Sequence, residues 1–449
     1  MSFAAATPAR ADEPGSGRVS GARTIELPRW PLASLASAAT VATGPRLATE
    51  SLRGALLWLM AFSGAFVFIE PSPYEVVGLF TIFIFALTGL SLPRALAPLL
   101  LLLILLNIGY AMAMVQVIEQ PKPVIWVGVS AYLATTAIFY AAALATNTER
   151  RLDLIMRGYV TAAVIASLVG IFGYFQLLGP MSDMFLRYER VRGTFNDPNV
   201  LGAFVILPGL LAFQRILVGR LSEMVRGSVV LLILMAGLLL SFSRAAWGQF
   251  ALCAILLMGL TFITSRSPQQ RFRIIALTLV GVFVMAAFVA ALLSVGKVAE
   301  LFQARASLEQ SYDVGHLGRF GRYILGFQLA LDHPFGLGAL QFTRIFIEDP
   351  HNTFLNAFMS GGWLGGVAYP TLSLVTIFFG ARFLATPTPW RSAYQAVYVA
   401  HIGTIVESAI IDIDHWRHYY LMLGVLWGLM AASVAYRRSP PVPGYRSAA

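Results

Sequence analysis

Arginines gather in a polar segment between two long apolar runs, where their charge could bind an anion. Arg190 and Arg192 open the segment 190–199, which ends at Asn199 and contains an Asp-Pro pair that is typical of the start of a helix. A helix N-terminus beside arginines is a natural place for a negatively charged group. The same basic loop could instead contact anionic lipid headgroups, and the sequence leaves both interpretations open.

Another arginine, Arg244, lies in the sequence SFSRAAW at 241–247, where two apolar runs meet. A charged side chain at membrane depth costs free energy and often marks a functional site. Its plainer interpretation is an arginine whose apolar stem lies along the bilayer while its head reaches the interface.

A second polar segment contains two more arginines and a histidine. Arg319 and Arg322 are three residues apart, so on a helix they would share a face. The sequence HPFGLG at 333–338 would end that helix. His351 comes directly before the next apolar run and would lie at the membrane surface, at the start of a helix. An isolated histidine is more often structural than catalytic.

Together these side chains favour one kind of chemistry. Arginines bind phosphate groups with two parallel hydrogen bonds, and several arginines could hold a diphosphate. Histidine has an unperturbed pKa near neutrality and is suited to general-base work. A base beside a diphosphate clamp would transfer a group from a lipid diphosphate, with arginines neutralising the leaving group where other enzymes use a metal ion.

Two further signals point elsewhere. Asp412 and Asp414 form an Asp-x-Asp pair, like the metal motif of many nucleotide-sugar transferases, but those donors are cytosolic, and we interpret the pair as structural. Glu407, inside an apolar run, could serve as the proton-relay carboxylate of a transporter. The chain has no phosphate-binding P-loop and no His-Glu-x-x-His zinc motif.

The amino-acid composition indicates that the chain lies in a lipid bilayer. Of 449 residues, 57% are hydrophobic and only 12% are charged, about half the share of a soluble domain. This excludes a soluble enzyme and a disordered chain, and the single cysteine, Cys253, excludes an internal disulfide. The net charge of +10 comes from arginines scattered among apolar runs, so we expect no nucleic-acid partner.

A spanning helix needs about 20 mostly apolar residues. Residues 1–50 hold no such run and indicate a disordered cytoplasmic tail without a signal peptide; residues 51–438 form the membrane domain, and 439–449 a second cytoplasmic tail. We expect an all-α polytopic protein with about twelve spans, near 54–69, 76–92, 95–114, 124–144, 154–178, 199–213, 227–243, 245–263, 274–293, 353–379, 393–411 and 419–435.

The basic residues set the expected orientation. With the N-terminus in the cytoplasm, the inner connections are uniformly basic, as at Arg150 and Arg266, while several outer ones are nearly bare. Both termini are then cytoplasmic. Two long outer segments, 179–198 and 294–352, become periplasmic loops, and loops of that length are usually functional.

In this order and placement, the polar segments resemble the O-antigen ligase and O-antigen polymerase membrane proteins, over roughly residues 190–366. The motifs that carry the resemblance are 192–199, 243–245, Arg319 followed by Tyr323, 333–338, and 351–352 with the glycine pair 361–362. Two departures exist: Tyr323 stands where the family usually has tryptophan, and Arg322 leaves open which loop arginine matches.

The resemblance implies a site and an activity. Position by position, the essential histidine and arginines of the family correspond to His351, Arg319 and Arg244. Its members work without metal or cofactor at the periplasmic face, on a glycan linked to undecaprenyl diphosphate, with inversion at the transferred sugar. Their fold is all-helical and GT-C-like.

We therefore expect an inner-membrane glycosyltransferase in which His351, Arg319 and Arg244 are catalytic. Arg190, Arg192, Arg322 and Asn199 would help to bind the diphosphate. The acceptor would be lipid A–core for a ligase or another lipid-linked glycan for a polymerase, and the sequence does not separate the two. Other partners would be membrane lipids and further polysaccharide-assembly membrane proteins. The alternative is a carrier, such as a lipid-linked glycan flippase or a proton-coupled transporter.

Overall fold

The computed structural model describes residues 45–69, 71–306, 318–346 and 348–438. Contacts divide the chain into Met1–Ala48 and Thr49–Ala449, and nearly all described residues belong to the second unit. The predictions for most of the first tail and for the second tail lie outside the described residues. Helix α2 already begins at Pro45, so residues 45–50, which we predicted to be part of the tail, are helical.

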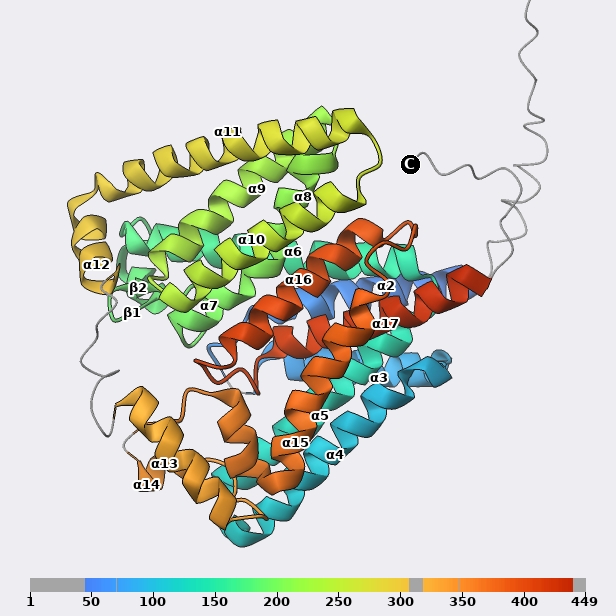
Figure 1. Ribbon diagram of the computed structural model, residues 1–449, viewed down its shortest axis with the longest axis vertical. Helices are drawn as coiled ribbons and strands as arrows, with labels where there is room; N and C mark the ends of the chain where they lie inside the picture. The colour runs from blue at the N-terminus through green and yellow to red at the C-terminus, as the bar shows by residue number, and fades with distance from the viewer. Residues whose placement is uncertain (1–44, 70, 307–317, 347, 439–449) are drawn as a thin grey trace, which may run out of the picture. The chain divides into compact units, whose positions relative to one another are not determined.

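Helices make up almost all of the described structure (Figure 1). The only strands in the described residues are β1 (Leu186–Arg187) and β2 (Arg190–Val191), which pair antiparallel. Short 3-10 turns are η1 (Arg94–Leu96), η2 (Val115–Val117) and η3 (Gly179–Phe185). The α-helices are α2 (Pro45–Ser63), α3 (Pro73–Thr88), α4 (Ala97–Met114), α5 (Pro121–Ala143), α6 (Thr148–Tyr174), α7 (Pro198–Phe204), α8 (Ile206–Val218), α9 (Leu221–Leu240), α10 (Arg244–Thr264), α11 (Pro268–Leu293), α12 (Gly296–Ala306), α13 (Arg319–Asp332), α14 (Phe342–Ile345), α15 (Thr353–Ala381), α16 (Arg391–Glu407) and α17 (Arg417–Arg438).

Each predicted apolar run overlaps a helix, and the sixth run is the pair α7 and α8. Nine segments among the described residues are long and apolar enough to cross a membrane. The helices α2, α3 and α16 do not reach that standard, and α3 is a shorter apolar helix. The chain is therefore a polytopic, all-helical membrane protein, and the count of twelve spans stays a prediction.

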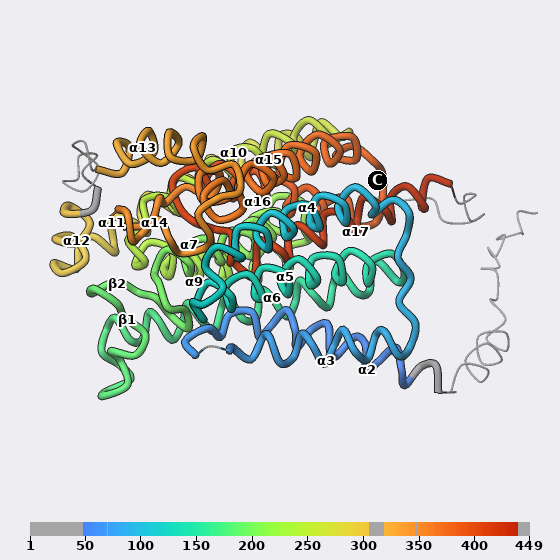
Figure 2. The backbone as a smooth tube through the Cα atoms, turned by 90° about the horizontal axis from the view of Figure 1, so that it is seen from below, coloured from blue at the N-terminus to red at the C-terminus, as the bar shows by residue number. Residues whose placement is uncertain are grey.

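The two long polar segments are structured and not simple loops. The segment 179–198 folds into η3 and the β1–β2 hairpin, and the described parts of 294–352 form α12, α13 and α14. The predicted helix after Gly318 is confirmed as α13, and it ends at His333, before Pro334. All these elements gather at one end of the bundle (Figure 2).

The turn at 333–338 is built into a break in α15. Gly362, at φ +61°, interrupts the helical backbone there, and a Cβ on it would lie 2.4 Å from the Pro334 carbonyl oxygen. The Leu337 N–H donates to the Met359 carbonyl at 2.8 Å, and the Trp363 N–H donates to Pro334 at 2.9 Å. These contacts hold the end of α13 against the first half of α15.

Small residues let the helices below this turn approach closely. A Cβ on Gly109 of α4 would lie 2.7 Å from the Gly361 carbonyl oxygen of α15 and equally near the Gly365 nitrogen. Such contacts between small residues are a common way to pack helices in membranes, where no hydrophobic effect drives helix association. The pairing of α4 with α15 fixes where α15 begins, and with it the residues directly before Thr353.

Candidate active site

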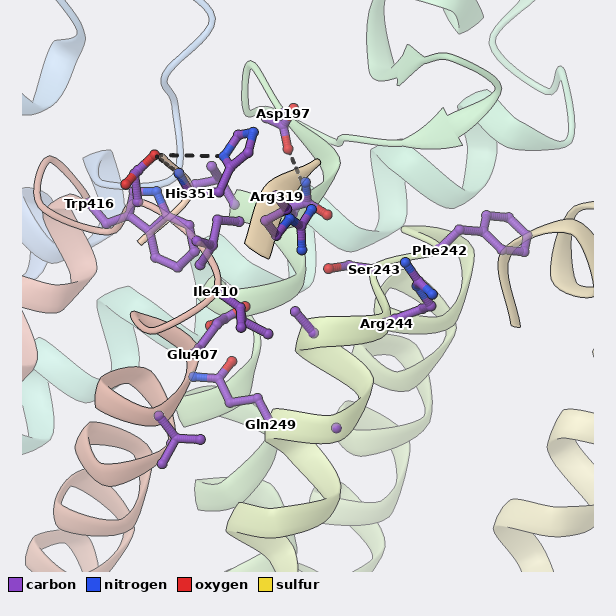
Figure 3. Close-up of a pocket in the computed structure, with 18 of the residues that line it drawn as sticks. Asp197, Phe242, Ser243, Arg244, Gln249, Arg319, His351, Glu407, Ile410 and Trp416 are labelled. Atoms are coloured by element: carbon purple, nitrogen blue, oxygen red, sulfur yellow. Dashed lines mark hydrogen bonds and ion pairs between the residues drawn. The ribbon is translucent and has the colours of Figure 1, made fainter. Parts of the chain in front are cut away.

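A cavity of about 690 Å³ is lined by residues of the hairpin, the start of α13 and the turn before α15. These elements gather at one end of the bundle (Figure 2). The other walls of the cavity come from α10, α16 and the turns around them. Figure 3 shows His351 and Arg319 in its upper part and Arg244 at one side, with Glu407 and Gln249 further down among the helices. The charged and amide side chains that line it are Arg190, Asp197, Asn199, Arg244, Gln249, Arg319, Asp349, His351, Glu407 and Asp412.

His351 is held in a turn that most residues avoid. Its φ is +49°, in the left-handed region that is costly for a residue with a side chain. The Asp412 carboxylate accepts the backbone N–H groups of His351 and Asn352, each at 3.1 Å, and Tyr323 donates its hydroxyl to the His351 carbonyl at 2.9 Å. Asn352 caps α15 by accepting the Leu355 N–H at 3.1 Å. The strained backbone is thus over-determined by neighbours from α13 and the α16–α17 loop.

The imidazole of His351 faces the same carboxylate. Its Nδ1 lies 3.7 Å from Asp412 Oδ2, which leaves Nε2 as the ring atom for other partners. Burial, followed by the positive charge of Arg319, lowers the pKa of His351, while Asp349 opposes the shift. A histidine whose pKa lies below its ordinary value is neutral at pH 7 and can accept a proton.

The pKa of Asp412 is raised well above its ordinary value by burial and then by the nearby carboxylates of Asp414 and Asp349. Its backbone hydrogen bonds from Asn352 and His351 act in the opposite direction. Asp414 has a separate task, because its Oδ2 accepts the Asn356 amide at 2.6 Å. The Asp-x-Asp pair therefore serves the backbone and side chains of the start of α15.

Arg244 is the first residue of α10. Ser243 caps that helix by accepting the Ala246 N–H at 3.4 Å, and Phe242 turns the chain there with φ +47°. The guanidinium therefore stands at a helix N-terminus, where the helix dipole adds positive potential. An anion in the cavity would be attracted both by the Arg244 guanidinium and by the N-terminus of α10.

Arg190 ties the hairpin to this turn. It is largely buried, and its Nε donates to the Ser241 carbonyl at 2.8 Å while a terminal nitrogen donates to Asn199 Oδ1 at 2.8 Å. Asp197 caps α7 by accepting the Asn199 N–H at 2.8 Å, as the Asp-Pro signal predicted. The hairpin, α7 and the α9–α10 turn are thus joined at one wall of the cavity.

The remaining two predicted residues do not line the cavity. Arg192 donates to the Met184 carbonyl at 2.9 and 3.1 Å, within its own loop. Arg322, only 4% exposed, pairs with Glu348 at 2.8 Å, and this hydrogen bond holds the pKa of Glu348 below its ordinary value. Of the two loop arginines, Arg319 is the one that reaches the cavity.

Sequence reasoning did not place three of the lining residues, Asp412, Glu407 and Gln249, in this site. Asp412 was interpreted only as structural, and its contact with His351 joins segments about sixty residues apart. Glu407 is 2% exposed, and neither of its carboxylate oxygens has a hydrogen-bond partner among the described residues. Gln249 donates to Thr404 at 3.1 Å, and its amide oxygen likewise has no described partner. The one feature of the sequence that could have indicated these residues was the carboxylate of Glu407 inside an apolar run.

Comparison with known protein families agrees with the sequence. Residues 229–369 match a family described as O-antigen ligase, which confirms the resemblance. The match runs from within α9 to within α15 and includes Arg244, Arg319 and His351. The hairpin arginines and Asp412 lie outside it. No curated protein matches the chain.

Proposed function

We propose that this protein is a membrane glycosyltransferase of cell-surface polysaccharide assembly, which moves a glycan from undecaprenyl diphosphate to a hydroxyl acceptor. The O-antigen ligase match over residues 229–369 is the premise. The observation that carries the proposal is that Arg244, Arg319 and His351, far apart in the chain, line one cavity. A proton acceptor beside two cations is the set of groups that this transfer requires.

The reaction would run as a single displacement. The acceptor hydroxyl oxygen attacks the anomeric carbon of the glycan and passes its proton to Nε2 of His351. The bond between that carbon and the diphosphate oxygen breaks, and its electron pair leaves with undecaprenyl diphosphate. Attack from the face opposite the leaving group inverts the anomeric configuration.

Arg244 and Arg319 would bind the diphosphate and neutralise the charge that grows on it as the bond breaks. Bidentate contacts from guanidinium to phosphate oxygens fix the geometry as well as the charge. Because these cations belong to the protein, we propose that transfer needs no divalent metal. Activity should persist in EDTA, and a loss restored by Mg²⁺ or Mn²⁺ would contradict this part of the proposal.

Asp412 would act as the positioning residue for the base. It accepts two backbone N–H groups at the strained turn and faces His351 Nδ1. A carboxylate in that place keeps Nε2 directed away from it, as in other sites where a third group orients a histidine. The hydrogen bonds that Asp412 accepts from the backbone of His351 and Asn352 stabilise the costly backbone conformation of His351.

We further propose that the cavity opens to the periplasm, with the protein in the bacterial inner membrane. The basic residues of the inner connections support that orientation. Ser294 and Gln269 lie near opposite ends of α11, so cysteines introduced there can test the orientation. The native cysteine, Cys253, is buried and should not react with the reagent. An impermeant thiol reagent added to intact spheroplasts should label Ser294→Cys and not Gln269→Cys; the reverse result would invert the orientation.

Two acceptors fit the proposal equally. A ligase would transfer the glycan to lipid A–core, and a polymerase would transfer it to another lipid-linked repeat. Purified protein should be supplied with one donor and each acceptor in turn. The product formed decides between the two.

The decisive experiment is a reconstitution with matched variants. The full-length protein in liposomes, with undecaprenyl-diphosphate-linked glycan and acceptor, should release undecaprenyl diphosphate and form the glycosylated acceptor. His333 offers a control, because it lies in the same region, contacts the Leu329 carbonyl at 2.8 Å and does not line the cavity. A carrier would move the lipid-linked glycan across the bilayer with no product, and His351→Ala would not stop it.

A further inference from the structure

A second cavity, of about 770 Å³, lies at the other end of α16, which lines the first cavity, and of α9, which ends beside it. Helix α16 contributes Glu407 to the first cavity and Ala393 to the second. Helix α9 ends at the turn before Arg244 and begins beside the second cavity, at Glu223. With 20 residues in α9, the two cavities are about 30 Å apart. The second cavity therefore belongs to the opposite end of the bundle.

Donor groups without protein partners line this cavity. Arg150 and Arg215 are exposed, and their side chains make no hydrogen bond or ion pair with any residue that the structure describes. Arg157 differs, because it pairs with Asp153 at 2.8 Å. The guanidinium groups of Arg150 and Arg215 are therefore available to bind an anion.

Gln214 is an independent sign of a ligand. It lines the cavity from α8, is only 4% exposed, and its amide nitrogen has no hydrogen-bond partner among the described residues. A buried donor that stays unsatisfied costs roughly 1–3 kcal/mol, so such groups generally have a partner. A ligand oxygen would supply it here.

The start of α6 adds to the positive potential. Thr148, Glu149 and Arg150 form its first turn and also line an adjoining hollow of about 380 Å³, with Trp390 in both. The first N–H groups of a 27-residue helix favour an anion. The Glu149 carboxylate in the same place favours a cationic group beside that anion.

Positively and negatively charged side chains are equally numerous in the lining of this cavity. It has three arginines and three carboxylates, from Glu149, Asp153 and Glu223. A ligand with several net negative charges would suit this lining less well than one that carries both signs. A tryptophan beside such a site, at the end of the helices, is typical of the membrane interface.

We propose that this cavity binds the headgroup of a zwitterionic membrane phospholipid. Arg150, Arg215 and the Gln214 amide hold the phosphate, and Glu149 holds the ammonium of an ethanolamine headgroup. The acyl chains remain in the bilayer beside the helices. This site is independent of glycan transfer, and its ligand comes from the leaflet opposite the candidate active site.

The test measures binding on the full-length protein in detergent. Dihexanoyl phosphatidylethanolamine, below its micelle concentration, should raise the midpoint of thermal unfolding in proportion to the logarithm of its concentration once the site is saturated. Dihexanoyl phosphatidylcholine, whose methylated ammonium cannot donate hydrogen bonds, should bind more weakly. Glycerol 3-phosphate and inorganic phosphate serve as soluble sources of the same anion.

The variants are chosen to keep the fold intact. Arg150→Gln and Arg215→Gln change exposed side chains without partners, and each should weaken phosphatidylethanolamine binding about tenfold, the effect of losing a hydrogen bond to a charged group. Gln214→Leu should weaken it as well. Arg226→Gln is the matched control, because Arg226 is exposed on α9 and lines neither cavity.

Three results would overturn the proposal. The first is the same affinity in Arg226→Gln and the cavity variants, and the second is no stabilisation of the wild-type protein by phospholipid. The third is equal binding of glycerol 3-phosphate or inorganic phosphate, which would assign the cavity to a soluble anion. Native mass spectrometry of phospholipid that co-purifies with each variant gives a second, independent measurement.

Discussion

The two cavities at opposite ends of α9 and α16 contain the same number of arginines, but these arginines come from different kinds of element. Arg190, Arg244 and Arg319 enter the first cavity from the hairpin, the start of α10 and the start of α13. The second cavity takes its arginines from within α6 and α8. The first contains a histidine and four carboxylates, of which Glu407 is buried, whereas the described lining of the second includes no histidine.

The difference shows what chemistry requires beyond charge. Arginines on helices can hold a phosphate wherever they share a cavity. In our proposal, transfer of a group also needs a neutral proton acceptor beside those cations, and the described lining of the second cavity includes no histidine that could serve as one. His351 is kept there by Asp412 and Tyr323, at a backbone angle that would otherwise relax.

The largest expected effect tests the base. His351→Ala should lower the rate of glycan transfer about 10²- to 10⁴-fold, the usual loss when a positioned general base is removed. Product formation by purified protein, at matched concentration, measures it. His333→Ala should keep normal transfer. Near-normal transfer by His351→Ala would show that His351 is not the base, and the proposed chemical difference between the two cavities would then have no support.

The next effect tests whether the clamp needs geometry as well as charge. Arg244→Lys and Arg319→Lys should each lower transfer roughly 10- to 100-fold, because lysine keeps the charge and loses the bidentate fork. In the second cavity, Arg215→Lys should change phospholipid binding by only a few-fold, since a point charge suffices there. Arg226→Lys is the control for both assays. Equal tolerance in the two cavities would remove the clamp from the mechanism.

A smaller effect concerns the residue that orients the base. Asp412→Asn should lower kcat about tenfold, the effect of one lost hydrogen bond to a charged group, with little change in the KM for the lipid-linked donor. Asp332→Asn, an exposed carboxylate at the end of α13, is the matched control. A rise in KM with kcat unchanged would mean that Asp412 shapes the donor site and does not orient the base.

The smallest effect is a displacement of the pH profile. Because burial and Arg319 lower the pKa of His351, kcat/KM should fall on the acid side at a pH below 6.5, the ordinary value for histidine. Asp349 raises that pKa, so Asp349→Asn should lower it and move the acid limb to still lower pH. A shift to higher pH, or none, would contradict the assigned base.

Local patterns in the sequence were sufficient for much of the fold. Apolar runs predicted the helices, since a bilayer tolerates little else. Asp197 and Pro198 predicted the start of α7, and the sequence at 333–338 predicted the end of α13. The run expected at 199–213 corresponds to α7 and α8, which are separated only at Val205 and together form one candidate span, Pro198–Val218.

The sequence by itself determined that the chain is a polytopic membrane protein and which residue types could carry chemistry. Arg244 stood out because charge at membrane depth is costly, and the resemblance to the O-antigen ligase proteins selected His351 and Arg319 together with it. The choice between Arg319 and Arg322 came from tertiary structure, which places one in the cavity and pairs the other with Glu348. The partnership of His351 with Asp412 was also decided there, because contacts between residues far apart in the chain leave no local pattern to read.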